Sequence, residues 1–172
     1  MQTFKEQIVV RKATGKDLAK QGAILIGAAV VVLALAFAMP FTDQFWFFLA
    51  LMIGGIIYAV FKLFPLFYIE YEYIFTSGDL DIDKITGKQK RKRLATINVE
   101  TLEEFGKYDE KVLEGKSFNT KIFACTTPTA EDTCYLIVDH PRHQHMLLVF
   151  NPNDMIKEGI LSMVPRTAKI YE

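Results

Sequence analysis

The sequence contains two long apolar runs, QGAILIGAAVVVLALAFAMPFT at residues 21–42 and QFWFFLALMIGGIIYAVFKLF at residues 44–64. The first run has no Asp, Glu, Lys or Arg, and the second has none before Lys62. A membrane-spanning helix needs about 20 apolar residues, at roughly 1.5 Å of rise each, to cross about 30 Å of hydrocarbon. The second run reaches that length if the ammonium group of Lys62 extends to the headgroups. We therefore predict a hairpin of two transmembrane helices over residues 21–64.

The residues around the two runs predict the orientation of this hairpin. The connection, Pro40-Phe41-Thr42-Asp43, is short and carries no basic residue. Lysines and arginines instead precede the first run and follow the second. The positive-inside rule then places both termini in the cytoplasm and makes the chain a two-pass protein of the cell (plasma) membrane. The aromatic residues 45–48 suit the far interface of the bilayer.

Small residues recur at four-residue spacing within the two runs, and such residues let helices approach closely in lipid. They are Ala23, Gly27, Ala50, Gly54, Gly55 and Ala59. One interpretation is packing of the two helices within one hairpin, and the other is an interface with a second copy or a partner helix. No ionisable residue lies in mid-membrane, which argues against a transporter or channel.

The N-terminal segment, residues 1–20, is polar and basic. Phe4 and Ile8 are four residues apart, so it reads either as a short helix on the membrane surface or as a basic tail that fixes the topology. Thr14 and Asp17 have the spacing of a helix N-terminus, in which Thr14 caps and Asp17 lies in the first turn.

From residue 66 onward the hydrophobic period changes from that of a helix to two, which indicates strands. We predict an antiparallel meander over residues 67–75, 80–83 and 90–99, because turn residues separate these segments. Further strands are predicted at 121–127, 134–139 and 145–150. Residues 100–109 fit either a helix or a bent strand, and residues 110–119 read as a loop.

A helix is predicted to follow the last strand. Asn151 is the expected N-cap, with Pro152 at the first helical position and Asp154 in the first turn. The expected apolar stripe is Met155, Ile156, Gly159, Ile160, Met163 and Val164. Pro165 is expected to end the helix.

The order of these elements resembles bacterial PH-like (pleckstrin-homology-like) domains that follow a two-helix membrane hairpin. The segment from Tyr71 to Leu80 and the tripeptide Ile97-Asn98-Val99 are similar to the opening of such domains. The resemblance implies a membrane α-helical hairpin plus a mainly-β antiparallel barrel or sandwich closed by a C-terminal α-helix. The expected divisions are a basic segment at 1–20, the hairpin at 21–64 and the PH-like domain at 65–172. The resemblance implies a fold and a location, and no reaction.

The most prominent charged feature is a basic run on the third predicted strand, consisting of Lys88, Lys90, Arg91, Lys92 and Arg93. Three interpretations stand: contact with anionic lipid, contact with a protein partner, or a solvated strand balanced by acids on neighbouring strands. Eukaryotic PH domains bind phosphoinositides through basic residues around the first hairpin turn. Here that turn, Ser77-Gly78-Asp79, is acidic, so the headgroup site does not carry over.

Cysteines and histidines suggest an alternative function in metal or redox sensing. Cys125, Cys134, His140, His143 and His145 are of the types that bind zinc, but their spacing fits no standard motif. The two cysteines are predicted to lie on adjacent strands of one hairpin. They should be reduced in the cytoplasm, and no Cys-x-x-Cys sequence is present.

No catalytic motif is recognisable, since Gly-rich phosphate loops, nucleophile elbows and His-Glu-x-x-His are missing from the sequence. The formal net charge of zero argues against nucleic-acid binding. We therefore expect a non-enzymatic interaction or scaffold protein without a cofactor or small-molecule substrate. Its expected partners are membrane lipid, a protein or a second copy of itself. A structural accessory subunit of a membrane complex is a further alternative.

Overall fold

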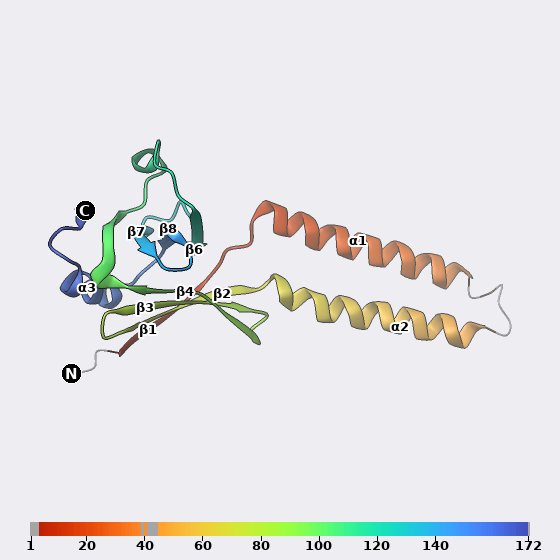
Figure 1. The fold of residues 1–172 in the computed structure, drawn as a ribbon. Helices are drawn as coiled ribbons and strands as arrows, with labels where there is room; N and C mark the ends of the chain where they lie inside the picture. Colours follow the sequence, from red (N-terminus) through yellow and green to blue (C-terminus); the bar gives the residue numbers. More distant parts are fainter. Residues whose placement is uncertain (1–3, 39, 41–44, 172) are drawn as a thin grey trace. The chain divides into compact units, whose positions relative to one another are not determined.

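The computed structural model describes residues 4–38, 40 and 45–171, and the chain folds as two compact units (Figure 1). The first unit is helical and covers residues 13–68. The second is built mainly from strands and combines the residues before 13 with those from 69 onward. The predicted connection at 41–43 lies outside the described residues.

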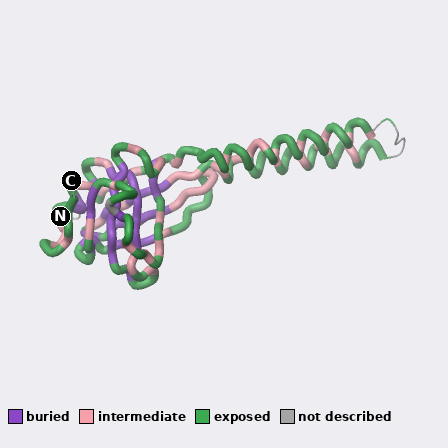
Figure 2. Tube along the Cα trace, turned by 90° about the horizontal axis from the view of Figure 1, so that it is seen from above, coloured by how far each residue is buried: buried purple, intermediate pink, exposed green. Residues whose placement is uncertain are grey.

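The helical unit contains α1 (Gly15–Ala38) and α2 (Trp46–Leu63), the second extended by a 3₁₀ turn at Phe64–Phe67. Both helices are long and apolar enough to cross a membrane, and none of their residues is buried (Figure 2). The predicted start of α1 is confirmed. The Thr14 hydroxyl accepts a hydrogen bond from the Asp17 N–H at 3.3 Å, and the Asp17 carboxylate accepts one from the Thr14 N–H at 3.0 Å. This reciprocal pair satisfies two of the N–H groups that a helix start leaves open.

The two helices lie side by side, and the half-buried residues of each mark the side that the other helix covers (Figure 1). The half-buried side chains recur at three- and four-residue spacing, at Ile24, Ala28, Val32 and Leu35 of α1 and at Leu49, Ile53, Ile56 and Val60 of α2. All six small residues at 23, 27, 50, 54, 55 and 59 are exposed instead. A Cβ added at Gly27, Gly54 or Gly55 would meet nothing within 4 Å. These small residues therefore lie outside the stripe of half-buried side chains, and their role in helix packing stays a prediction.

The first sheet of the second unit has four antiparallel strands in the order β1-β2-β3-β4. They are β1 (Phe4–Val10), β2 (Ile69–Thr76), β3 (Asp79–Thr86) and β4 (Lys90–Asn98). The predicted three-strand meander is thus confirmed as β2, β3 and β4. The helical unit is inserted between β1 and β2, which are neighbours in the sheet.

Strand β1 corrects the prediction for the N-terminal segment, which is neither a surface helix nor a tail over residues 4–10. Val9 is buried in the core, whereas Phe4 and Ile8 point to the opposite face and are more than half exposed. Gln7 fixes the strand further, because its amide donates to the Asn151 carbonyl at 2.9 Å and accepts from the Asn153 N–H at 2.7 Å. A local pattern does not reveal this strand, because its partner β2 begins only after both helices.

The second sheet has five strands in the order β6-β8-β7-β5-β9. They are β5 (Leu102–Lys107), β6 (Thr120–Ala124), β7 (Cys134–His140), β8 (Gln144–Phe150) and β9 (Lys169–Tyr171). The expected antiparallel pairing holds for β5 with β7 and β7 with β8, but β6 runs parallel to β8 and β9 parallel to β5. Of the two predictions for residues 100–109, the strand is correct.

Two 3₁₀ turns flank β5. The first, Val99–Thr101, begins where the Asn98 side chain accepts a hydrogen bond from the Glu100 N–H at 2.9 Å. The second, Glu110–Leu113, lies in the segment predicted as a loop. These turns carry the chain from the first sheet into the second and out of β5.

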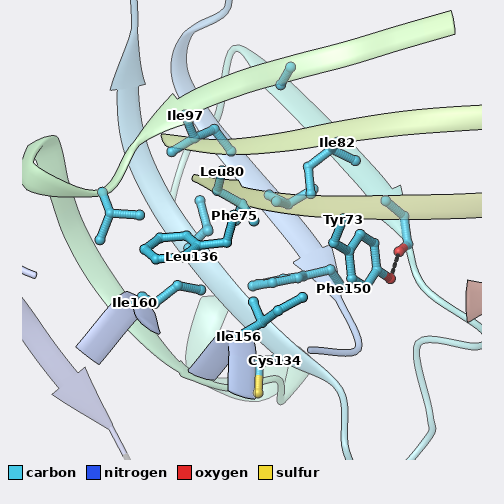
Figure 3. Packing of buried hydrophobic residues seen from close by; sticks show 14 of the residues in the cluster. Tyr73, Phe75, Leu80, Ile82, Ile97, Cys134, Leu136, Phe150, Ile156 and Ile160 are labelled. Atoms are coloured by element: carbon cyan, nitrogen blue, oxygen red, sulfur yellow. Dashed lines mark hydrogen bonds between the residues drawn. The ribbon is translucent and has the colours of Figure 1, made fainter. Parts of the chain in front are cut away.

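The main core lies between the two sheets and helix α3 (Asp154–Met163) (Figure 3). Its largest fully buried side chains include Tyr73 and Phe150, whose rings meet edge-to-face with centroids 5.6 Å apart. A smaller cluster covers the other face of the second sheet and consists of Leu113, Cys125, Tyr135, Ile137, Leu147 and Val149. The alternation of buried side chains along β7 supplies both clusters.

Helix α3 begins at a different cap from the predicted one, but it ends at Met163, just before Pro165, as predicted. Its N-cap is Asn153, whose side chain accepts from the Ile156 N–H at 2.9 Å, and not Asn151. Met155 is 55% exposed and leaves the predicted apolar stripe. Gly159 packs flat against Phe75, where an added Cβ would lie 2.8 Å from the ring. The chain continues past the helix into β9, so α3 is not its last element.

Candidate interaction surface

The hairpin of β3 and β4, which carries the basic run, closes through a tight turn. Gly87 and Lys88 both have positive φ, 62° and 58°, and the Gln89 N–H donates to the Thr86 carbonyl at 3.3 Å. Two successive positive φ angles are typical of the turn type whose twist matches the flanking strands. The turn therefore fixes the register of the basic strand against β3.

This register divides the basic run between the two faces of the first sheet. We call the face with the buried Leu80 and Ile82 the inner face, and the opposite one the outer face. The outer-face pairs are Asp83 with Arg93 and Ile85 with Arg91, and the inner-face pairs are Lys84 with Lys92 and Thr86 with Lys90. The register shifts after Ile82, so that Arg93 lies opposite Asp83, and this shift produces the division. Arg91 and Arg93 thus lie on the opposite face of the sheet from Lys90 and Lys92.

On the outer face, acidic side chains neutralise both arginines. The Arg91 guanidinium lies 2.8 Å from the Glu72 carboxylate, and Arg93 contacts both Asp83 and Asp81, the latter at 2.6 Å. Burial raises the pKa of Glu72, while Arg91 opposes this shift. The hydrogen bond to Asp83 raises the pKa of Arg93. For the two arginines, the charges are therefore balanced by acids on neighbouring strands, which is one of the three interpretations of the basic run.

On the inner face, the lysines are left without such neutralisation. We define the lysine cluster as Lys84, Lys90 and Lys92. Lys90 and Lys92 are exposed and Lys84 is half-buried. Among the residues that the structure describes, no carboxylate forms an ion pair with any of the three. Three positive charges therefore remain unbalanced on one face of the hairpin.

The lysine cluster lies at the end of the first sheet where the chain passes into and out of the helical unit. The register aligns Ile69, the first residue of β2, with Thr86, and Thr86 with Lys90. Strand β1 also ends beside the start of β2. Lys84 and Lys92 form the pair two residues further in, about 7 Å along the strands.

The histidines take separate structural roles. His140 Nδ1 accepts hydrogen bonds from the N–H groups of Arg142 and His143, at 3.1 and 3.2 Å, and its Nε2 lies 3.0 Å from the Thr96 carbonyl oxygen. This pattern assigns the ring proton to Nε2. Both ring nitrogens are thus occupied in closing the β7–β8 turn and holding it to β4.

The other two histidines have their own partners, although the His143 ring lies beside that of His140 with ring centroids 4.8 Å apart. His143 Nε2 lies 3.2 Å from the Leu94 carbonyl oxygen, and His145 stacks on Phe118 with ring centroids 5.3 Å apart. Within the described part of the chain, no group of three or more His, Cys, Asp or Glu side chains is placed to hold a metal ion. The metal-sensing alternative therefore has no donor set in these residues.

The two cysteines are buried, reduced and separated. The prediction that they share a hairpin is wrong, because β8 lies between β6 and β7. Cys134 belongs to the main core and Cys125 to the smaller cluster on the opposite face of the sheet. Burial raises the pKa of the Cys125 thiol to about 11 and also raises that of Cys134, which Lys157 opposes. Both thiols are therefore poorly placed for redox sensing.

Asn151, the residue predicted as the helix N-cap, is instead the centre of a buried polar network. Its side-chain oxygen accepts from the Thr126 N–H at 2.7 Å, and its amide donates to Asp132 at 3.0 Å and to Thr133 at 2.9 Å. Its own N–H donates to the Tyr73 hydroxyl at 3.2 Å. The network joins the loop before β7 to both sheets. The Asn-Pro pair at 151–152 indicates that Asn151 makes side-chain hydrogen bonds to the backbone, but it does not show whether these cap the helix or join neighbouring loops.

Two sheets around a common core, with an amphipathic helix packed against it, are consistent with the PH-like fold. The chain belongs to the family described as "Bacterial PH-like domain (DUF6106)", which it matches over residues 1–170. The match includes β1 and both helices, so the interruption of the sheet by a helical pair lies within the region the family describes. No curated protein and no solved structure matches the chain.

Proposed function

We propose that this protein is a membrane-anchored, non-enzymatic interaction module whose PH-like domain lies at the cytoplasmic face of the bacterial cell membrane. The observation that carries the proposal is the place of the two exposed apolar helices, which interrupt the first sheet between β1 and β2. With both helices in the bilayer, the domain is attached through two short connections, residues 11–14 and residue 68. Two attachments to one sheet restrict which side chains meet the membrane.

The cytoplasmic location is supported by the distribution of charge. Basic residues flank both apolar helices on the side of the PH-like domain, as the positive-inside rule requires. The non-enzymatic role is supported by the sequence, which contains no recognisable catalytic motif. An interaction module needs only a stable surface that is held in place.

Protease digestion tests the location. We expect the full chain in intact spheroplasts to resist added protease, and the PH-like domain to be degraded once the membrane is opened. A periplasmic domain digested in the same sample is the positive control. Degradation of residues 69–171 in intact spheroplasts would refute the cytoplasmic location.

Co-purification tests the interaction. We expect the full chain, solubilised from native membranes in mild detergent, to retain specific proteins or lipids relative to an unrelated two-span protein. An identical set from both preparations would contradict a role in interaction.

A second candidate, a structural subunit of a membrane complex, is supported by the helical unit. Its small residues lie outside the contact between α1 and α2 and leave space at three glycines. Close helix packing against a second copy or another protein would use such a surface. Native mass spectrometry should then detect an oligomer that Gly27→Leu with Gly54→Leu abolishes. A wild-type chain that is only monomeric, with no other protein bound, would contradict this candidate.

A further inference from the structure

We propose that the lysine cluster is a binding surface for anionic lipid headgroups, which it holds through diffuse charge attraction without a headgroup-specific pocket. The inference rests on the proposed membrane anchoring, and it names the partner of the PH-like domain. It also separates Lys90 and Lys92 from the arginines of the basic run, because only these two members of the run, together with Lys84, take part.

The first argument is the separation of charge across the β3–β4 hairpin. Arg91 and Arg93 are bound to carboxylates on the outer face and add little net charge there. The lysine cluster on the inner face has no such counter-charge among the described residues. The acids that nearly balance the basic run in the sequence therefore form ion pairs only with its two arginines in the fold.

The second argument is the position of the cluster in the chain. Lys90 aligns through Thr86 with Ile69, where β2 begins directly after the helical unit. Lys84 and Lys92 lie only about 7 Å further along the strands. This distance is comparable to the Debye length of about 8 Å at physiological ionic strength, so an anionic surface that attracts Lys90 also attracts Lys84 and Lys92, in attenuated form.

The third argument is the chemistry of the side chains, which favours lipid over a protein partner. A lysine is a flexible, strongly hydrated point charge, whereas arginine provides the planar fork that fits one defined carboxylate or phosphate. Protein interfaces are enriched in arginine and aromatic anchors and depleted in lysine. The cluster consists of lysines alone, and their flexible point charges suit a fluid layer of headgroups better than one fixed partner. We therefore expect dependence on lipid charge and none on headgroup stereochemistry.

Amine acetylation of the full chain in lipid nanodiscs tests the proposal. Reaction rates at individual lysines are measured by mass spectrometry in phosphatidylcholine discs with and without phosphatidylglycerol. Each lysine attracted to anionic lipid should react about fivefold more slowly in the anionic discs. Salt at about 1 M shortens the Debye length to about 3 Å and should remove the difference. Lys157 and Lys169, on α3 and β9, should react equally in both discs and serve as internal controls.

A matched pair of variants provides the second measurement. Lys84→Gln with Lys90→Gln and Lys92→Gln should reduce the phosphatidylglycerol retained by the protein on release from the discs. The control removes the same charge elsewhere, through Lys157→Gln with Arg166→Gln and Lys169→Gln, and should retain lipid as the wild type does. Equal losses in both variants would overturn the proposal.

The remaining outcomes are equally decisive. Equal acetylation of the cluster in both kinds of disc overturns the proposal. Protection in native membranes but not in anionic discs also overturns it, and identifies a protein partner instead. Because nanodiscs expose both membrane faces, these results do not depend on topology. Failure of the cytoplasmic location and failure of lipid binding are thus distinguishable.

Discussion

Replacing Asn151 with alanine should destabilise the PH-like domain more than its single side chain suggests. Asn151 is only 2% exposed, and its side chain makes three hydrogen bonds, to Thr126, Asp132 and Thr133. A hydrogen bond contributes about 1 kcal/mol net, and one to a charged group about 1.5–3 kcal/mol. The expected loss for Asn151→Ala is therefore about 4 kcal/mol.

Asn151→Asp separates hydrogen bonding from shape. The variant keeps the acceptor for the Thr126 N–H but places a carboxylate oxygen against Asp132, where the native amide donates at 3.0 Å. Two carboxylates at this distance oppose each other until one is protonated. We expect Asn151→Asp to be destabilised at neutral pH and to recover part of the loss on acidification, whereas Asn151→Ala gains no such recovery.

Urea unfolding of the full chain in detergent, followed by tyrosine near-ultraviolet circular dichroism, measures these effects. With a slope of about 1–3 kcal/mol/M, Asn151→Ala should lower the urea midpoint by more than about 1 M. Asn98→Ala is the matched control, since Asn98 makes one exposed side-chain bond, to the Glu100 N–H. If Asn151→Ala shifts the midpoint no further than Asn98→Ala, the reasoning about the buried network is refuted.

Three other perturbations give direct tests. Because burial raises the pKa of Glu72, the folded state binds that proton more readily, and stability should fall as pH rises from the ordinary carboxyl pKa through the raised one. Glu72→Gln should remove this fall, and an unchanged pH slope of the urea midpoint would contradict the assignment. Cys125, whose pKa is about 11, and Cys134 should both resist Ellman's reagent at neutral pH and react once urea unfolds the domain; a rapidly reacting thiol in the native protein would be the contrary result. Gly159→Ala places a Cβ 2.8 Å from the Phe75 ring, so overpacking of about 1–3 kcal/mol should outweigh a helix gain of about 1 kcal/mol and lower the midpoint. A raised midpoint would mean that the ring moves aside.

Features that depend on local sequence were predictable. Apolar runs of spanning length identified α1 and α2, and the reciprocal spacing of Thr14 and Asp17 located the start of α1. Period-two alternation identified β2 to β4, and the positions of β6 to β8 followed from the same signal, whereas β5 lay in a segment that fitted either a helix or a bent strand. In each case the residues that decide the structure lie within a few positions of one another.

Features that depend on distant partners were not predictable. Strand β1 is recognisable only by its pairing with β2, and β9 is a three-residue strand that exists because β5 offers an edge. Asn151 and Asn153 are equally good caps by composition, and only the surrounding loop decides that Asn151 is buried. The small residues of the helices also follow this rule, since their spacing does not say which flank meets the neighbouring helix.

The candidate surface was predictable in composition and not in orientation. The run from Lys88 to Arg93 is evident in the sequence, as are the acids that surround it. Which charges meet is set by the register of β3 and β4 and by the irregularity after Ile82. Lys84 could not be assigned to the cluster from the sequence, because it belongs to the preceding strand and meets Lys92 only through cross-strand pairing.

The insertion of both helices between β1 and β2 has a consequence for biogenesis. Strand β1 leaves the ribosome before both helices, and about 60 residues, 11 to 68, are synthesised before its neighbour β2 begins. At about 5–20 residues per second, translation separates the two strands by about 3–12 s. During that interval Phe4, Ile8 and Val10 lie on a strand whose partner β2 has not yet been synthesised. With the helices in the membrane, as we propose, completion of this domain depends on their integration, and a chain whose helices fail to integrate exposes an aggregation-prone strand to quality-control proteases.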